Sequence, residues 1–279
     1  MTVVEPEVFR AERRSRYSRQ MALSMRERDR GSGVVGGVDA GRRGKAPAWI
    51  LAVSEAQPGA SAEFRSYPTF GQLWDYAKTK GLLVVAVDMP LGLPMASCRW
   101  RPCEERARGR LGKKRERAVF PSPPLCTLDA VEHAEADRLA VEAGGNTLSG
   151  DTYRLLEKCR DVREALDTAA FRSSARPRVA EVHAEVCFWE MNGKKPTHYT
   201  KRSERGQADR LSLLSSHFSG IDAAVEESAD APPDGALRRY DMFDAAAAAW
   251  TARRIASGDA ERLGNDERDE GGFPMSIWI

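Results

Sequence analysis

The sequence predicts an α/β protein built on one mixed sheet with helices around it. Three short strand-like segments, 34–41, 48–54 and 62–68, are separated by glycine, proline and serine, as in an antiparallel meander. A helical pattern follows them, and then a continuous apolar run at 82–90 that is typical of a buried strand. The order of three strands, a helix and a fourth strand indicates a sheet of the α/β class.

Composition sets the outer limits of this prediction. The chain has 279 residues, of which 42% are hydrophobic, enough for one large domain or two small ones. Residues 1–32 are charged and poor in large aliphatic side chains, so we expect a disordered or weakly helical basic tail there and a folded domain over 33–279. The five cysteines form no C-x-x-C pair, which favours reduced thiols. Without a membrane-spanning run or an apolar signal segment, we expect a cytoplasmic protein with no membrane partner.

The remaining elements follow from local patterns. Phe70, Leu73 and Trp74 have helical spacing, and this helix closes at Gly81. A charged, helix-rich interval at about 97–175 contains a proline-rich break and is expected to be an insertion into the sheet. A short strand follows at 178–182, and the segment after His183 is either more strand or a helix ending at Gly193. We expect helices at 204–218 and 236–257, with a polar loop at 226–235 between them.

Acidic side chains stand where three predicted strands end. Asp39 and Asp88 each follow an apolar strand, and Glu181 lies at the end of the strand at 178–182. The carboxyl ends of strands are where ligands gather in such sheets. If the first and fourth strands are neighbours, unpaired carboxylates there repel one another, and a hard cation such as Mg²⁺ or Mn²⁺ resolves that repulsion. Taken singly, each acid is also explained by a turn, a loop cap or the polar face of an edge strand.

Two further acids, Asp241 and Asp244, open a helix that continues into five alanines. Aspartate near a helix N-terminus caps free N–H groups and complements the helix dipole, which requires no function. Alternatively, Asp244, and with it Asp241, faces the sheet and completes the acidic cluster. The alanine run would then let this helix lie close against the strands.

Several motifs together resemble a known family. The segments "GVDAG", "VAVDMPLGLP", "CEERARGRLGKKRERAVFPSPP", "EVHAEVCFWEMNGKKP" and "DMFDAAAAAWTARR" occur in this order along the chain. Over roughly residues 34–279 the chain resembles the predicted RNase H-like nuclease family known as domain of unknown function 429. That resemblance implies an RNase H-like mixed five-stranded sheet with flanking helices and acids at the ends of the first and fourth strands and on a late helix. Two positions depart from the family pattern: Ala184 replaces a proline after His183, and Glu104 replaces an aspartate.

The resemblance implies a metal-dependent nuclease. Mg²⁺ or Mn²⁺ would be held by Asp39, Asp88, Glu181 and Asp244, with Asp241 as a further ligand, and would promote phosphodiester hydrolysis. His183 is a candidate proton shuttle, or else a structural histidine beside the strand end. "GVDAG" also occurs in actin-like ATPases and sugar kinases, so a phosphotransferase is one alternative. A catalytically inactive nucleic-acid-binding module is the other.

Basic residues suggest how nucleic acid would bind. Residues 99–117 carry nine Lys or Arg against three Glu, and a second basic cluster covers 194–210. Either cluster is a solvated helix face or a set of phosphate contacts. The candidate contacts to nucleic acid are Arg106, Arg110, Lys113, Lys114, Arg115, Lys201, Arg202 and Arg210. The sequence does not distinguish DNA from RNA or define the oligomeric state.

Overall fold

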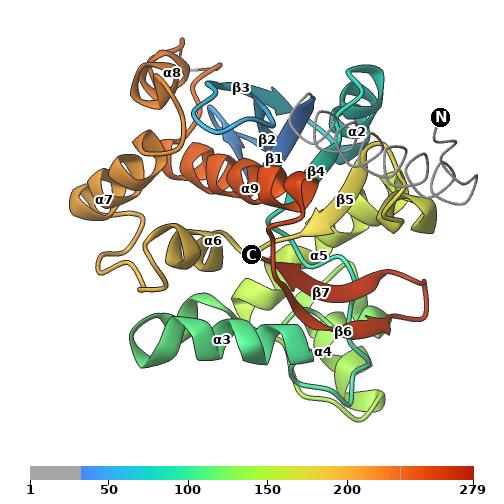
Figure 1. Cartoon of the computed structure of the whole chain (residues 1–279). Coiled ribbons are helices and arrows are strands. Elements are labelled where there is room, and N and C mark those ends of the chain that lie inside the picture. Colours follow the sequence, from blue (N-terminus) through green and yellow to red (C-terminus); the bar gives the residue numbers. More distant parts are fainter. Residues whose placement is uncertain (1–32, 233) are drawn as a thin grey trace, which may run out of the picture.

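A computed structural model describes residues 33–232 and 234–279. The expected tail at 1–32 lies outside the described residues. The main sheet has five strands in the order β3-β2-β1-β4-β5 (Figure 1). Its strands are β1 (Val34–Arg43), β2 (Ala46–Glu55), β3 (Ala62–Tyr67), β4 (Val84–Val87) and β5 (Arg178–Glu181). The predicted α/β class with a mixed five-stranded sheet is therefore confirmed.

The directions of the strands follow from their connections. β1, β2 and β3 pair antiparallel through short turns, whereas β1, β4 and β5 pair in parallel. Parallel neighbours need a crossover, which α2 (Phe70–Thr79) provides before β4. Thr69 caps α2 by accepting a hydrogen bond from the backbone N of Gln72. The carboxyl ends of three parallel strands therefore meet at one edge of the sheet.

Helices cover both faces of the sheet. One face carries α9 (Arg239–Ser257), which lies across β1, β2 and β4, together with α6 (Ala184–Met191), α7 (Glu204–Ser215) and α8 (Ile221–Ala229). The other face carries α2 and α5 (Gly150–Ala165). The segment after His183 is thus the helix α6, and it ends before Gly193, whose φ of 63° lies in the left-handed region.

The interval between β4 and β5 is largely helical, and its last α-helix, α5, covers one face of the sheet. It contains α3 (Pro102–Arg115), α4 (His133–Glu142) and α5, with short 3₁₀ turns at Glu116–Ala118, Leu125–Thr127 and Thr168–Phe171. A C-terminal hairpin, β6 (Arg262–Arg268) and β7 (Pro274–Trp278), packs against α3 and reaches β5 through a bridge between Val182 and Trp278. The sequence patterns predicted neither this hairpin nor α8, part of which falls in the expected polar loop.

The alanine run of α9 packs directly on the sheet. Ala245 to Ala249 are fully buried. A Cβ at Gly37 would overlap the backbone N of Ala249 and the carbonyl oxygen of Ala245. Small residues on both elements therefore let the helix backbone touch the strand backbone, as the alanine run predicts.

Candidate active site

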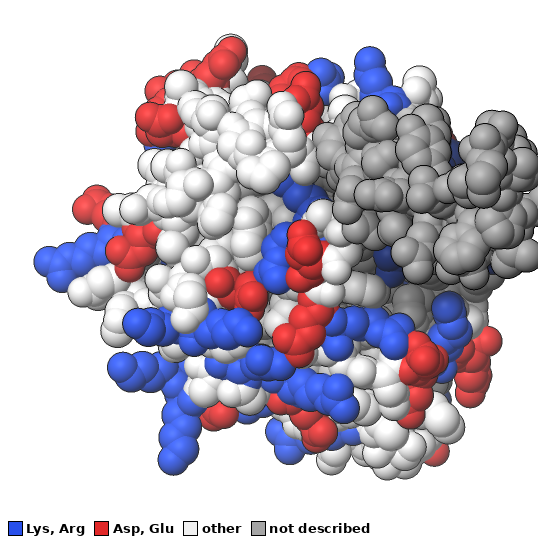
Figure 2. All heavy atoms as spheres, viewed as in Figure 1, with Lys and Arg blue, Asp and Glu red and all other residues white. Residues whose placement is uncertain are grey.

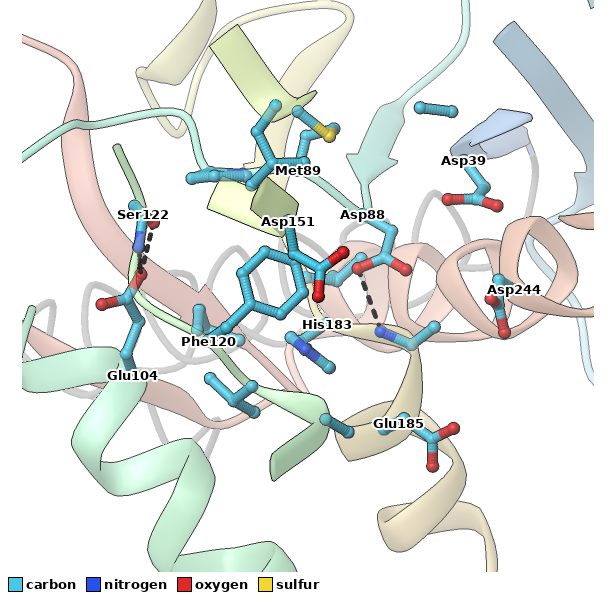
Figure 3. A pocket seen from close by; sticks show the side chains of 18 of the residues that line it. Asp39, Asp88, Met89, Glu104, Phe120, Ser122, Asp151, His183, Glu185 and Asp244 are labelled. Carbon is cyan, nitrogen blue, oxygen red and sulfur yellow. Dashed lines mark hydrogen bonds between the residues drawn. The ribbon is translucent and has the colours of Figure 1, made fainter. Parts of the chain in front are cut away.

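Asp39 and Asp88 lie side by side because their strands are parallel neighbours. Val38 of β1 is in register with Val87 of β4, and each is followed directly by one of the two aspartates. The backbone N of Asp88 donates to the carbonyl of Val38 at 2.8 Å, which continues the pairing past the end of β4. Figure 3 shows both carboxylates turned toward the carboxylate of Asp244 on α9. The structure therefore brings together three of the predicted acids.

The approach of Asp244 is set by one face of β1. Residues 37, 39 and 41 alternate with the residues on the opposite face and share the side that α9 covers. A Cβ at Gly41 would meet the Asp241 side chain, just as one at Gly37 would meet the helix backbone. Asp39 thus stands between two glycines that admit the helix.

Lys201 lies in the acidic cluster. Its Nζ forms an ion pair with Oδ2 of Asp244, and its side chain is 36% exposed while that of Asp244 is 1% exposed. The carboxylates of Asp244 and Asp39 outweigh the effect of burial and raise the pKa of the Lys201 ammonium. This residue was predicted to contact nucleic acid, but the structure shows its charge directed at the carboxylates.

One ammonium does not balance the cluster. Burial raises the pKa of Asp39 well above its ordinary value, against the effect of Lys201, and the charges of Asp244 and Asp88 add to the rise. Burial likewise raises the pKa of Asp244. Among the described residues, Oδ1 of Asp244 is buried without a hydrogen-bond partner. The cluster therefore keeps negative charge and a buried acceptor oxygen, both of which favour binding of a further cation or of a proton.

His183 and the N-terminus of α6 form the next part of the wall. The backbone N of Ala184 donates to Oδ1 of Asp88 at 3.2 Å, which fixes that carboxylate (Figure 3). His183 is the residue before α6, and its buried Nδ1 has no hydrogen-bond partner within the described residues. It lines the same pocket as Asp39, Asp88 and Asp244.

Glu181 belongs to a different network from the three aspartates. Arg101 donates to both of its carboxylate oxygens, at 2.9 and 2.6 Å, and the backbone N of Leu91 donates at 2.9 Å. Burial raises the pKa of Glu181, against the effect of Arg101. The carboxylate predicted as a metal ligand is thus already satisfied by a bidentate guanidinium, the strong form of such a pair.

The same arginine extends this network to the proline-rich segment. Nε of Arg101 donates to Glu104 at 3.0 Å, and Glu104 in turn accepts from the backbone N of Ser122 at 3.0 Å and from the Ser122 hydroxyl. The side chains of Arg101, Glu104 and Ser122 are buried, as is that of Glu181. Sequence reasoning noticed Glu104 only as a departure from the family pattern. Arg101 was counted merely as part of a basic run.

Glu185 is a further carboxylate in the pocket that the sequence did not single out. Although burial raises its pKa, Arg210 and Arg115 together hold that pKa below its ordinary value. Thr197 also donates to it at 3.2 Å. Arg210, predicted to contact phosphate, is fully buried beneath this carboxylate. That prediction is corrected because a guanidinium with no exposed surface cannot reach a nucleic-acid backbone.

Asp241 sits apart from the pocket wall, in the first turn of α9. Its Oδ2 accepts from the backbone N of Arg42 at 3.2 Å. Burial and the charge of Asp244 raise its pKa to about 6. The residue near the helix N-terminus is thus Asp241, whereas Asp244 lies one turn further on and faces the sheet.

The pocket has a volume of about 540 Å³ and a partly basic wall. Arg115, Arg117 and Arg202 line it. Figure 2 shows Lys and Arg side chains gathered over the face of the molecule where α3 lies in Figure 1. On α3, Lys113 and Lys114 are exposed.

Other basic side chains of the first cluster make contacts within the protein. Arg106 is exposed and donates to the carbonyl of Gly264 at 3.2 Å. Arg110 pairs with Glu261, and its guanidinium lies 5.5 Å from the centre of the Trp189 ring. These contacts hold α3 against the C-terminal hairpin and α6. Arg106 and Arg110, which were predicted to contact nucleic acid, thus already make contacts within the protein.

Several features are absent from residues 33–232 and 234–279. No group of three or more His, Cys, Asp or Glu side chains there is arranged to hold a metal ion as it stands. No helix in these ranges is long and apolar enough to cross a membrane. Each of the five cysteines, all in the described part, is a free thiol, as predicted.

The fold and the site define an α/β protein with an acidic pocket at the carboxyl edge of a mixed sheet. The chain belongs to the family described as "Protein of unknown function (DUF429)", whose model matches residues 37–269. No curated protein and no solved structure matches the chain.

Proposed function

We propose that this protein is a divalent-metal-dependent nuclease of RNase H-like type. One observation carries the proposal: Asp39, Asp88 and Asp244 converge from two parallel strands and a helix (Figure 3), and within the described residues Lys201 is the cation paired with this cluster. Clustered carboxylates with raised pKa values are typical of functional sites. The family resemblance of the motifs supports the same reaction class.

The donor set fits Mg²⁺ or Mn²⁺. These ions prefer carboxylate oxygen and retain several waters, so they need few protein ligands. The unpartnered Oδ1 of Asp244 and the raised pKa of Asp39 mark a place where added positive charge is favourable. Since Lys201 now pairs with Asp244, its ammonium must withdraw from that carboxylate for three aspartates to act as ligands. A bound ion would activate water for attack on a phosphodiester and stabilise the leaving oxygen.

Each residue of the pocket has a distinct role in this proposal. Asp39, Asp88 and Asp244 would hold the ion, and the hydrogen bond from Ala184 orients Asp88. His183 can hold a proton at its unpaired Nδ1, at the wall of the same pocket. Through Arg101, Glu181 fixes the end of β5 and is a positioning residue in this proposal.

The glycines of "GVDAG" weigh against the phosphotransferase alternative. For such glycines to admit a nucleotide phosphate close to the backbone, the space beside them must be open. Here the space beside Gly37 is taken by the α9 backbone and the space beside Gly41 by Asp241. Their small size is already explained by packing.

Replacing Asp244 with Asn tests the nuclease. The change keeps the size of the side chain and removes the charge that a metal needs. With Mn²⁺ and single-stranded, duplex and branched DNA and RNA, we expect cleavage to fall about a hundredfold or more, because the stabilisation that a metal supplies is worth several kcal/mol.

Asp222→Asn is the matched control, since Asp222 is an exposed aspartate in the first turn of α8. It should cleave like the unchanged protein. Full activity of the Asp244 variant would remove Asp244 from the site. Absence of cleavage by the unchanged protein on every substrate would favour a binding module without catalysis.

A further inference from the structure

Phe120 is an exposed aromatic ring in the wall of the acidic pocket. Its exposed fraction is 36%, and among the described residues it is the one exposed large hydrophobic side chain that lines this pocket. Asp151 and His183 line the same pocket and are labelled with the ring in Figure 3. The nuclease chemistry proposed above uses no apolar ring, so Phe120 has no role in it so far.

The backbone on both sides of Phe120 is held firmly. The carbonyl of Val119 accepts from Arg108 at 2.8 Å, and the carbonyl of Pro121 accepts from the Thr152 hydroxyl at 3.0 Å. Ser122 is tied to the buried Glu104 by its backbone N and its hydroxyl. Three prolines in 121–124 further restrict the segment. The backbone that carries the ring is therefore already ordered, so little conformational entropy of the protein is lost when a ligand stacks on the ring.

Arginine side chains line the same pocket as the ring. Arg115, Arg117 and Arg202 line the same pocket, and Arg117 and Arg202 are exposed. The pocket volume of about 540 Å³ lies within the roughly 300–1,000 Å³ of pockets that take one small organic group. A flat apolar face, cations and a carboxylate cluster are the three parts needed to receive a base, its phosphates and a reacting phosphodiester.

We propose that Phe120 is the stacking platform for one unpaired nucleobase, so that the substrate is nucleic acid with a single-stranded stretch or end at the scissile phosphate. This inference rests on the proposed nuclease and names its substrate class. In a continuous duplex both faces of each base are covered by neighbouring bases, and no face is left for the ring. An unpaired base can leave the stack and lie on an aromatic side chain.

Binding measured without metal tests the proposal apart from cleavage. Fluorescence anisotropy in EDTA would compare labelled single-stranded DNA, single-stranded RNA, duplex DNA and a single strand made of abasic sites. Phe120→Leu keeps an apolar side chain but removes the aromatic face. We expect it to weaken single-strand affinity roughly fivefold to 150-fold, the range for loss of one base–aromatic stack, and to leave duplex affinity unchanged. Phe120→Trp should retain affinity.

Tyr76→Leu is the control. Tyr76 is a partly buried aromatic residue on α2 that also has basic neighbours, Arg65 and Lys80, but lies outside the pocket. It should bind all strands like the unchanged protein, and the abasic strand should bind the Phe120→Leu and unchanged proteins equally. A melting curve for each variant verifies folding, which a half-exposed side chain should not disturb.

The outcomes separate the two proposals. Equal losses for single strand and duplex, no loss at Phe120→Leu, or no binding of any strand would overturn the stacking platform. Stacking as expected, with no cleavage when Mn²⁺ is added, would overturn the nuclease while leaving the platform intact. The DNA and RNA arms show which sugar accompanies the base, and competition by a mononucleotide as strong as that of the single strand would contradict a polymer substrate.

Discussion

Replacing Lys201 with Met tests whether the ion pair between Lys201 and Asp244 is permanent or whether a divalent cation displaces the Lys201 ammonium. The change removes the positive charge paired with Asp244 and keeps an unbranched side chain of similar length. In the metal-free protein, Asp244 is then left buried with no cation beside it, although Asp39 and Asp88 remain. We therefore expect the metal-free variant to be less stable than the unchanged protein.

The magnitude follows from burial. Breaking a fully buried ion pair costs about 3–5 kcal/mol and breaking an exposed one about 0–1 kcal/mol. Since Asp244 is 1% exposed but Lys201 is 36% exposed, an intermediate loss of about 1–3 kcal/mol applies. For a chain of this size each kcal/mol changes the Tm by about 2–4 °C, so the Tm should fall by roughly 2–12 °C.

Added Mn²⁺ should stabilise the Lys201→Met variant more than it stabilises the unchanged protein. In the unchanged protein the ion must displace the Lys201 ammonium from Asp244, and in the variant it need not. If this raises the affinity tenfold, the variant gains about 1.4 kcal/mol more from the same Mn²⁺ concentration, or roughly 3–6 °C in Tm.

Melting curves with EDTA and with millimolar Mn²⁺ measure both effects. Lys113→Met, which removes an exposed lysine of α3, is the control and should respond to Mn²⁺ like the unchanged protein. An Mn²⁺ response that is the same in the Lys201 and Lys113 variants would refute the idea that Lys201 occupies the place of the ion.

Two further predictions concern stability. Burial raises the native pKa of Asp241 from 3.8 to about 6, so the protonated carboxyl stabilises the fold fully below pH 3.8, and this stabilisation is lost as the pH rises through 6. Without metal, Asp241→Asn should therefore be more stable than the unchanged protein by up to about 3 kcal/mol above pH 6 and equally stable near pH 4. Urea midpoints between pH 4 and 7 measure this, and a gain that does not vary with pH would contradict it. Gly37→Ala should cost at least about 3 kcal/mol because its Cβ meets the α9 backbone, while Gly109→Ala, with open space on α3, should be neutral or stabilising by about 0.5–1 kcal/mol in the same denaturation assay.

Local patterns predicted those parts of the fold that local physics determines. The strands β1, β2 and β3 and the helices α2 and α9 each carry their own periodicity and punctuation, so their positions could be read from the sequence. The hairpin of β6 and β7 could not, because "RLGNDER" is mostly polar and exposed, and its pairing depends on packing against α3. Helix α8 was missed because the expected polar loop covered its C-terminal half.

The candidate site shows the same division. The strand-end rule brought Asp39 and Asp88 together, because both follow the last residues of β1 and β4 that pair in parallel. It was wrong about the end of the first strand, since β1 continues past Asp39 to Arg43. It did not predict which basic side chain pairs with each carboxylate. Arg101 comes from a segment some 80 positions before Glu181, and Arg210 reaches Glu185 from α7. Charge counts along a sequence cannot tell a basic side chain that pairs with a carboxylate inside the protein from one that is free to meet phosphate, so Arg210, which is buried against Glu185, and Lys201, which pairs with Asp244, were both assigned to nucleic acid.

The stretch Gly37 to Gly41 explains why the site and the core cannot be separated. Residues 37, 39 and 41 share one face of β1, and α9 lies along that face. The helix backbone comes close only because the first of these residues has no side chain and because Ala245 to Ala249 are small. Asp244 directly precedes this alanine run, so the contact that buries the helix also brings its carboxylate toward Asp39. A substitution that pushed α9 away from the sheet would therefore alter the acidic cluster even if every acid were kept. The two glycines of "GVDAG" thus shape the site through packing, although they have no side chain to bind a metal ion.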